Sequence, residues 1–362
     1  MIKVLHIAAI ENNPFNGVCV AAPQHALAQQ EFAAVGFINI KNIAVEALAG
    51  NSVKQIPFTK PFEIRALPEP FNKPDVVIFH ECYRPDYLQI ARNLRKYDIP
   101  YIVMPHGELG KEAQSKKYLK KKAANILLFN RFTNQALAVQ CLSQRELQET
   151  NFGKKKILIT NGVFIPDTRK TSFHDDRVEL IYIGRLDAFH KGLDLMVDAV
   201  AKVQEVLRQE KVHIDIYGPD RLGRYEHMES LIDKAGVKDV VHMHHEVAGA
   251  EKEKLLLEAD AFIQTSRFEG MPLGILEALS YGIPCLVTEG TNLSEKVSVY
   301  SAGWSAKTDA EDISRAIVRA IKDRQHYPEY GENGRKFVEK EFSWHTIARN
   351  AIDTYENLIA SK

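Results

Sequence analysis

Two glutamates that stand eight positions apart, Glu269 and Glu277, enclose a segment with the composition of a helix start. Pro272 suits the first position of a helix, because an N–H group would have no partner there in any residue. Gly270 and Gly274 allow a ligand to approach the backbone closely. The unpaired N–H groups of a first helical turn carry partial positive charge and favour a phosphate. The segment therefore predicts an anion-binding helix start.

The two carboxylates predict a second kind of contact. A carboxylate repels a nearby phosphate, but it is a strong acceptor for hydroxyl groups. Glu269 and Glu277 therefore fit the hydroxyls of a sugar or a ribose better than they fit phosphate. The alternative is a buried strand–helix unit that carries one loop charge and one solvated glutamate.

The residues around these glutamates form a wider pattern. Ser266 precedes Glu269-Gly270, a short apolar loop follows, Glu277 is followed by Ala278, and residues 281–288 have the sequence YGIPCLVT. This pattern resembles the nucleotide-sugar site of glycosyltransferase family 4, whose members have the GT-B fold. The resemblance implies an α/β protein with two Rossmann-like domains, whose parallel sheets face each other across a cleft. It also implies a C-terminal helix that crosses back to the first domain.

Two cations, Arg185 and Lys191, follow a predicted strand in the second half of the chain. The resembled enzymes place this pair on the donor diphosphate. Departure of a nucleoside diphosphate leaves about two negative charges, which a metal or fixed cations must neutralise. No two aspartates have the Asp-x-Asp spacing of a metal-dependent site. We therefore expect Arg185 and Lys191 to replace the metal, with no cofactor; a structural loop with surface cations is the alternative.

The first half of the chain supplies two further candidates. His106-Gly107 closes a predicted strand, and the resembled family has a similar His-Gly that faces the donor sugar and the reaction centre. An imidazole could bind a sugar hydroxyl or stabilise the transition state, or it could be an ordinary turn histidine. Gly17 follows the first strand, where many family members carry two glycines. The segment is not G-x-G-x-x-G, which argues against a dinucleotide dehydrogenase.

The resemblance implies a role for each matching residue. His245 and Glu246 are expected near the nucleobase, although His245 stands where the family commonly has glycine. Glu269 is expected on the transferred sugar and not as a nucleophile, so the sugar would transfer by front-side displacement. The catalytic residues are expected to be His106, Arg185, Lys191 and Glu269. The donor-binding residues are expected to be Gly17, Gly184, Arg185, Lys191, Glu269, Gly270, Met271, Pro272, Leu273, Gly274 and Glu277.

Continuous apolar strands that alternate with helices predict buried parallel sheets. The predicted strands are Val4–Ala9, Val35–Ile40, Val76–His80, Tyr101–Pro105, Ala136–Gln140, Ile157–Thr160, Glu179–Gly184, His213–Tyr217, Val240–His244, Ala261–Gln264, Cys285–Val287 and a weak strand at Trp304. The predicted helices include Pro23–Glu31, Arg84–Lys96, Leu193–Leu207, Tyr225–Ala235, Lys252–Glu258, Pro272–Ser280, Asn333–Phe342 and Trp344–Ala360.

The 362 residues suffice for two domains. The turn-rich stretch from Asn161 to Asp167 predicts a boundary, with an acceptor-binding domain over residues 1–165 and a nucleotide-sugar-binding domain over residues 166–340. Residues 341–362 are expected to form the helix that returns to the first domain.

The overall composition restricts the class of protein. The formal net charge is zero, which argues against a nucleic-acid-binding protein, although local patches can remain. Four cysteines without a Cys-x-x-Cys pair fit a reducing compartment better than a disulfide or zinc framework. No apolar run is long enough to span a membrane, and the chain starts with a strand and without a signal-peptide pattern. We therefore expect a cytoplasmic protein.

The segment Lys111–Arg131 contains six lysines and one arginine but only one glutamate. An apolar stretch, ILLF, lies within its second half. Such a segment could bind an anionic membrane surface at the inner face of the plasma membrane, or it could be a solvated basic face beside a core helix.

Taken with the resemblance, these features predict a retaining, metal-independent hexosyltransferase. Its expected donor is a UDP-sugar, and its expected acceptor is a saccharide hydroxyl, on a lipid such as a polyprenyl diphosphate. The expected pathway is bacterial capsule, O-antigen or exopolysaccharide biosynthesis. Two alternatives stay open. A non-hydrolysing nucleotide-sugar epimerase would isomerise the donor without an acceptor, and a non-catalytic sugar-nucleotide-binding subunit would bind the donor without turnover.

Overall fold

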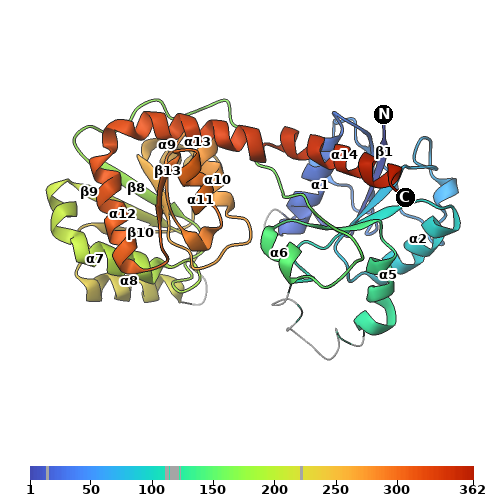
Figure 1. Ribbon diagram of the computed structural model, residues 1–362, viewed down its shortest axis with the longest axis horizontal. Helices are drawn as coiled ribbons and strands as arrows, with labels where there is room; N and C mark the ends of the chain where they lie inside the picture. The colour runs from blue at the N-terminus through green and yellow to red at the C-terminus, as the bar shows by residue number, and fades with distance from the viewer. Residues whose placement is uncertain (14–15, 111–113, 115–121, 123, 221–222) are drawn as a thin grey trace. The chain divides into compact units, whose positions relative to one another are not determined.

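The computed structural model describes residues 1–362 except 14–15, 111–113, 115–121, 123 and 221–222 (Figure 1), and the side chains of residues 126 and 127 are also left out. Two compact units divide the chain. Unit 1 comprises Met1–Gly162 together with Trp344–Lys362, and unit 2 comprises Val163–Ser343. The sequence predicted these boundaries at residues 165 and 340.

Unit 1 is built on a parallel sheet, and the described strands have the order β3-β2-β1-β4-β5-β6-β7. The central strands are mostly apolar and are buried on both faces, as a parallel sheet covered by helices requires. The strands are β1 (Lys3–Ala8), β2 (Ala34–Asn39), β3 (Lys54–Gln55), β4 (Val76–His80), β5 (Tyr101–Met104), β6 (Ala138–Cys141) and β7 (Lys156–Leu158).

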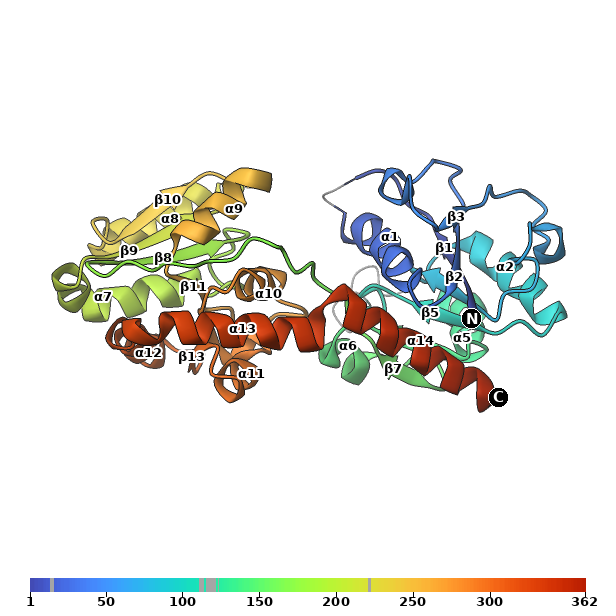
Figure 2. The same cartoon turned by 90° about the horizontal axis from the view of Figure 1, so that it is seen from above.

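Helices cover both faces of this sheet. On one face, α1 (Gly17–Gln29) packs beside α14 (Trp344–Ala360), which Figure 2 shows from above. On the other face lie α2 (Pro85–Lys96) and α5 (Asn130–Asn134), which follows a π-helical segment, η3 (Asn125–Phe129). A short helix, α6 (Gln144–Glu149), follows β6.

Unit 2 repeats the architecture with the strand order β10-β9-β8-β11-β12-β13 in its described part. The strands are β8 (Val178–Ile183), β9 (Val212–Tyr217), β10 (Val241–His244), β11 (Ala261–Gln264), β12 (Cys285–Thr288) and β13 (Gly303–Ala306). One face carries α7 (Leu193–Gln209), α8 (Arg224–Ala235) and α12 (Ala310–Lys322). The other carries α9 (Gly249–Glu258), α10 (Leu273–Ser280), α11 (Ser294–Val299) and α13 (Tyr327–Phe342).

Both sheets reverse their strand order once, between β1 and β4 in unit 1 and between β8 and β11 in unit 2. Ligands of open parallel sheets bind outside the carboxyl ends of the strands at such a switch point. Each unit of this chain therefore presents one edge where a site is expected. No helix within the described residues has the length and apolar composition needed to cross a membrane.

Several predicted elements need correction. The helix predicted from Pro23 begins at Gly17, because Asn16 caps it by accepting hydrogen bonds from Val18 and Cys19, and the buried helix tolerates Pro23 in its interior. The helix predicted from Asn333 begins at Tyr327. The structure adds β3, α5, α6, α11 and α12, which were not predicted.

Candidate active site

The loop after β11 places the carboxylate of Glu269 at the switch point of unit 2. Glu269 is buried, and its Oε1 accepts hydrogen bonds from Ser266 Oγ at 2.6 Å and Gln264 Nε2 at 2.9 Å. Lys191 Nζ lies 2.6 Å from the same oxygen. Three donors therefore hold one oxygen of this carboxylate in a fixed position.

The second oxygen of Glu269 has no such partner. Oε2 makes no hydrogen bond to any residue that the structure describes, whereas the backbone carbonyl of Glu269 accepts from Asn292 Nδ2 at 2.5 Å. A carboxylate with one anchored oxygen and one free oxygen is arranged to accept a hydrogen bond from a ligand. The arrangement suits a hydroxyl group.

The start of α10 leaves backbone donors unpaired next to Glu269. Within the described residues, the N–H groups of Gly270, Met271 and Gly274 have no hydrogen-bond partner, and Pro272 has no N–H. Free N–H groups at a helix start favour an anion. Pro272 occupies the N-cap position and not the predicted first helical position, because its ψ of 77° keeps it outside the helix, which begins at the exposed Leu273.

A glycine without space for a side chain brings Lys191 to Glu269. Gly192 caps α7 with a φ of +63°, and a Cβ there would lie 1.9 Å from the carbonyl oxygen of Thr265. The hydroxyl of Thr265 donates to the carbonyl of Gly192 at 2.8 Å. Arg267 adds a second link between the two loops, with its guanidinium on both carboxylate oxygens of Asp194 at 2.7 and 2.9 Å.

Arg185 follows β8 directly, across the switch point from the Glu269 loop. Gly184 N donates to Tyr217 O at 2.9 Å and so fixes the backbone in front of Arg185. The Arg185 side chain is exposed and has no hydrogen bond or ion pair within the described chain. Burial lowers the pKa of His190. The charge of Glu269 raises this pKa, whereas the charges of Lys191 and Arg185 lower it, which indicates that these charges share one region.

Glu277 lies in the second turn of α10 and is half-buried. Its Oε2 pairs with Lys252 Nζ of α9 at 2.5 Å, a partner that sequence analysis missed. Lys252 carries no local signal, because it lies 25 residues away and only the packing of α9 near α10 brings it close. The pair leaves Oε1 of Glu277 without a hydrogen bond among the described residues.

The turn after β10 contains the two residues that were expected near the nucleobase. His245 and Glu246 are both exposed, and the ring of His245 stacks on Tyr225 of α8 with centroids 5.2 Å apart. The neighbouring His244 bonds to Asp215 Oδ1 at 2.7 Å and stacks on Tyr217. This turn of unit 2 therefore carries an exposed histidine ring, that of His245.

In unit 1, the carboxyl end of β5 carries His106. His106 and Gly107 have positive φ values of 50° and 85°, and strain of this kind in a non-glycine residue is often found at functional sites. Glu146, which sequence analysis missed, holds the turn by accepting from the N–H of Gly107 at 2.8 Å. Burial raises the pKa of Glu146. Gly17 lies exposed at the first turn of α1.

Comparison with known proteins finds a family model that matches unit 2. Residues 164–337 match the family model of the glycosyl transferases group 1. The matched segment makes up most of unit 2, which comprises Val163–Ser343. Every site residue that the sequence predicted in the second half of the chain lies within the matched segment.

Individual relatives of the chain are also glycosyltransferases by name. The chain is 26% identical to the MMP alpha-(1->4)-mannosyltransferase of Mycolicibacterium hassiacum over 201 residues. The aligned region covers 54% of this chain and 47% of that protein. It is 23% identical over 314 residues to the amylovoran biosynthesis glycosyltransferase AmsK of Erwinia amylovora, which covers 82% and 74%. The chain spans about half the length of several curated relatives that it matches, 47%, 47% and 40% in three cases.

Solved structures agree on the fold. HepE of Anabaena, solved with UDP and glucose, superposes with a TM-score of 0.68 at 18% identity, over 98% of this chain and all of that one (100%). WaaG, a glycosyltransferase involved in lipopolysaccharide biosynthesis, gives a TM-score of 0.59 at 15% identity, over 97% and 99%. The predicted GT-B fold with two Rossmann-like domains is therefore confirmed.

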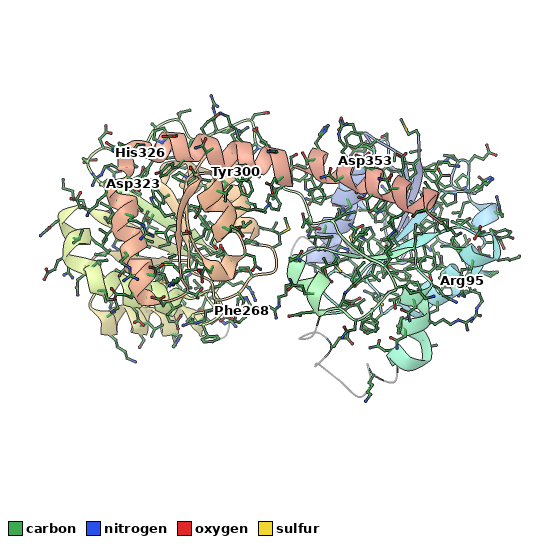
Figure 3. All side chains as sticks on the ribbon, viewed as in Figure 1. Arg95, Phe268, Tyr300, Asp323, His326 and Asp353 are labelled. Carbon is green, nitrogen blue, oxygen red and sulfur yellow. The ribbon has the colours of Figure 1, made fainter. Side chains whose placement is uncertain are left out.

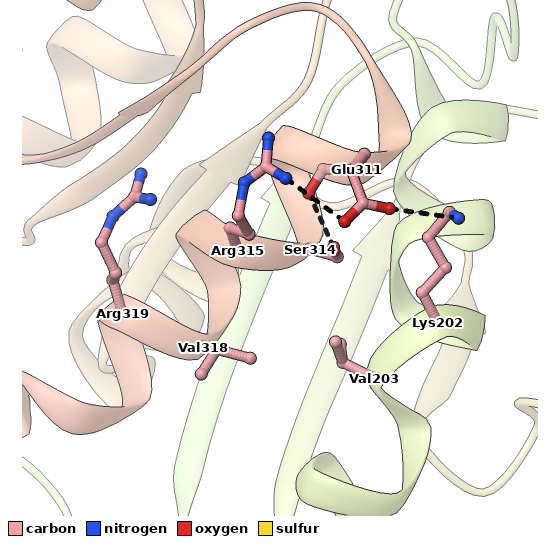
Figure 4. A pocket seen from close by; sticks show the side chains of 7 residues that line it. All are labelled: Lys202, Val203, Glu311, Ser314, Arg315, Val318 and Arg319. Carbon is pink, nitrogen blue, oxygen red and sulfur yellow. Dashed lines mark hydrogen bonds and ion pairs between the residues drawn. The ribbon is translucent and has the colours of Figure 1, made fainter.

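A hollow elsewhere on unit 2 does not share the features of this site. It has a volume of about 600 Å³ and lies between α7 and α12 (Figure 4). Two of its three cations are already paired, because Lys202 and Arg315 both pair with Glu311, at 3.3 and 3.2 Å, and the third, Arg319, donates to the carbonyl of Ser305 at 3.0 Å. No glycine-rich helix start opens into it. The start of α10 therefore stays the candidate anion site of unit 2.

The buried histidines of unit 1 predict sensitivity to mild acid. Burial lowers the pKa of His6 to about 3 and of His25 to about 4, and it lowers the pKa of His80 well below its usual value. Below the unfolded pKa of about 6.5, the unfolded chain therefore binds more protons than the folded chain. Stability is complete above this pH and falls as the pH drops towards 4, by up to about 2 kcal/mol per histidine between pH 6.5 and 5.

The measurement can follow each unit separately, because the chain has two tryptophans, Trp344 in unit 1 and Trp304 in unit 2. In a Trp304→Phe variant, the fluorescence melting temperature of unit 1 should fall steeply between pH 7 and pH 5. In a Trp344→Phe variant, the melting temperature of unit 2 should change less over the same pH range, because none of the described histidines of unit 2 is buried. Equal, shallow slopes for the two units would contradict the prediction.

Proposed function

We propose that the protein is a retaining, metal-independent glycosyltransferase that uses a nucleotide-diphosphate sugar, with UDP as the nucleotide. The observation that carries the proposal is the arrangement around Glu269 in unit 2. One carboxylate oxygen is free for a hydroxyl, unpaired N–H groups lie beside it, and the guanidinium of Arg185 has no partner in the described chain. A nucleotide sugar supplies both an anion and hydroxyl groups. HepE, solved with UDP and glucose, supports the choice of nucleotide.

Each group has a proposed role. The start of α10 and the cations Arg185 and Lys191 would hold the diphosphate and stabilise the charge that develops when it leaves. Glu269 Oε2 would accept from a hydroxyl of the transferred sugar, and Glu277 Oε1 from a ribose hydroxyl. Front-side displacement needs no side-chain nucleophile, and retention of configuration follows from it. The fixed cations supply the charge that a metal supplies in other transferases.

The first experiment is a thermal-shift screen of UDP-, GDP-, ADP- and CMP-sugars with and without EDTA. A UDP-sugar at about 100 times its Kd should stabilise unit 2 by about 2.7 kcal/mol, and EDTA should not change the shift. If UDP-sugars bind and are isomerised without acceptor, the protein is an epimerase. If no nucleotide sugar binds to well-folded protein, the proposed function is wrong.

Glu277 gives a sharper test of the ribose contact. Glu277→Gln should weaken UDP-sugar binding by about 10–100-fold, because a hydrogen bond to a charged group contributes about 1.5–3 kcal/mol. Isothermal titration calorimetry would measure the change. Lys252→Met is the control, since it removes the ion pair but keeps the carboxylate, and it should bind the donor nearly as well. If the Lys252 variant loses as much affinity, the pair is structural and Glu277 does not act alone.

For the acceptor, we propose a lipid-linked saccharide, on a polyprenyl diphosphate or a similar lipid, in bacterial cell-surface polysaccharide synthesis. AmsK, named for amylovoran biosynthesis, supports this pathway class. Such an acceptor would require the protein to work at the inner face of the plasma membrane. Most of the basic segment Lys111–Arg131 lies outside the described residues.

A described part of unit 1 does support a membrane contact. A pocket of about 210 Å³ between α2 and α5 is lined by Arg92, Arg95 (Figure 3) and Arg131, and by Leu128, which is 48% exposed. None of these arginines has a carboxylate partner within the described chain. Unpaired guanidinium groups beside an exposed apolar side chain suit an anionic lipid surface.

Replacement of the three arginines Arg92, Arg95 and Arg131 by glutamine should reduce this contact. At about 1 kcal/mol for each basic residue near an anionic surface, the affinity for vesicles with anionic lipid should fall roughly 100-fold. Co-sedimentation with such vesicles at low salt would measure it. The matched control removes the same charge from unit 2 with Lys202→Gln, Arg315→Gln and Arg319→Gln. Equal losses from both triple variants would indicate a nonspecific charge effect and contradict the proposed surface.

A further inference from the structure

Three histidine rings of unit 1 form a continuous hydrogen-bonded row that ends at His106. His6 lies in β1 and His80 is the last residue of β4. His6 Nδ1 lies 2.9 Å from His80 Nε2, and His80 Nδ1 lies 2.9 Å from His106 Nε2. The rings of neighbouring members stack with centroids 5.2 Å apart. Nδ1 of His106 is the free end of the row, since no described residue bonds to it.

The other end of the row continues into a buried group of polar side chains. His6 Nε2 lies 3.1 Å from Gln29 Oε1 of α1. Beyond Gln29, the hydroxyl of Tyr355 in α14 donates to Gln140 Oε1 at 2.6 Å, and Gln140 Nε2 donates to the backbone carbonyl of Ile159 at 3.4 Å. The side chains of Gln29, Gln140 and Tyr355 are all buried.

The backbone carbonyl of Ile159 fixes the direction of the hydrogen bonds as far as Tyr355. A carbonyl oxygen can only accept, so Gln140 must turn its amide nitrogen to Ile159 and its oxygen to Tyr355. Tyr355 then donates its hydroxyl proton to Gln140, and its oxygen can accept a hydrogen bond only from an N–H group. Gln29 Nε2 has no hydrogen-bond partner among the described residues, and Gln29 Oε1 lies 3.1 Å from His6 Nε2. Gln29 Oε1 therefore faces His6 as an acceptor.

From Gln29 onwards, each histidine ring can carry its proton on only one of its two nitrogens. His6 donates from Nε2, so its Nδ1 carries a lone pair and accepts from Nε2–H of His80. Nδ1 of His80 accepts in turn from Nε2–H of His106. This assignment requires one proton on each ring, and burial lowers the pKa of His6 and of His106 to about 3.

We propose that this row of side chains fixes His106 as the Nε2–H tautomer, so that Nδ1 accepts a hydrogen bond from a substrate hydroxyl. His6 and His80 are then positioning residues, which act on the substrate through His106. The tautomer follows from the structure of unit 1, whereas the identity of the hydroxyl rests on the proposed glycosyl transfer. A neutral imidazole with a lone pair cannot neutralise a departing diphosphate, so this role remains with the cations of unit 2.

The first test needs no variant and no substrate. Long-range proton–nitrogen NMR correlation of the full chain with ¹⁵N-labelled histidine at pH 7 distinguishes a protonated from an unprotonated ring nitrogen. The expected result is an N–H at Nε2 and a lone pair at Nδ1 for His6, His80 and His106. An N–H at Nδ1 of His106, or an exchanging mixture of tautomers, would overturn the proposal.

A variant then tests the positioning role. His80→Phe keeps an aromatic ring in the row but removes both hydrogen bonds. The NMR signals of His106 should change from one tautomer to a mixture, and kcat should fall about 10–100-fold, as for other groups that orient a functional imidazole. The KM for the donor should change little. Unchanged His106 signals in folded His80→Phe protein would contradict the role of His80.

His25→Gln is the matched control. His25 is as buried as His80, but it bonds to Asn161 outside the row, at 3.0 Å. The variant should keep the His106 tautomer and kcat, so equal losses in both variants would indicate a general packing effect and overturn the proposal. The expected tautomer in a protein that transfers no sugar would refute the proposed function and leave the tautomer assignment standing.

Discussion

Replacement of Arg185 by alanine is expected to lower kcat by roughly 10²–10³-fold, as for the loss of a single group that stabilises transition-state charge. The melting temperature of unit 2 is expected to stay unchanged. Both results have the same structural reason. The guanidinium is exposed and makes no hydrogen bond or ion pair within the described chain, so it contributes little to the fold and is available to an anion. Turnover of a UDP-sugar and differential scanning fluorimetry would measure the two quantities.

Two controls make this prediction specific. Arg185→Lys keeps the charge but loses the planar fork that binds two phosphate oxygens, so it should recover only part of the activity. Lys202→Ala removes a cation from α7 of the same unit, where it pairs with Glu311, and should leave kcat unchanged. If Arg185→Ala retains full turnover, Arg185 is a surface cation and the diphosphate lies elsewhere.

The strands of both sheets could be predicted from the sequence because their signal is local. Runs such as Val76–Phe79 are apolar throughout, which is the pattern of a parallel strand buried on both faces. Helix starts were less predictable. Asn16 is a signal for a helix start before Gly17, whereas the proline within α1 is a signal for a later start. The helix begins at the earlier position because it packs on the sheet. The amphipathic α12, with Ile313, Ala316, Ile317 and Ala320 buried, was readable and was missed.

The candidate site likewise has one part with a local sequence signal and another part that depends on tertiary packing. The loop and helix start around Glu269 could be predicted because glycine, proline and glutamate at fixed spacing restrict the local backbone. The partners of these residues could not. Lys252, Glu146 and the row from Gln29 to His106 come from separate elements, and no local spacing in the sequence connects them. Contacts over long sequence separations depend on tertiary packing, which a single sequence does not display.

The ion pair of Lys191 with Glu269 gives the second large prediction. Both side chains are mostly buried, with exposed fractions of 14% and 9%. Removal of one member leaves the other charge buried, which costs about 3–5 kcal/mol. Lys191→Met should therefore lower the melting temperature of unit 2 by roughly 10 °C, at about 2–4 °C per kcal/mol for a unit of this size. It should also lower kcat by roughly 10²–10³-fold, because the diphosphate loses a cation.

A double variant separates these two effects. Glu269→Gln keeps an acceptor oxygen for Ser266 and Gln264 but has no charge. Combined with Lys191→Met, it leaves no unpaired buried charge, so most of the lost stability should return, as when buried ion pairs are replaced as a unit. The activity should not return, since both groups are expected on the substrate. If the double variant recovered turnover together with stability, the pair would only support the loop, and the donor site would need other ligands.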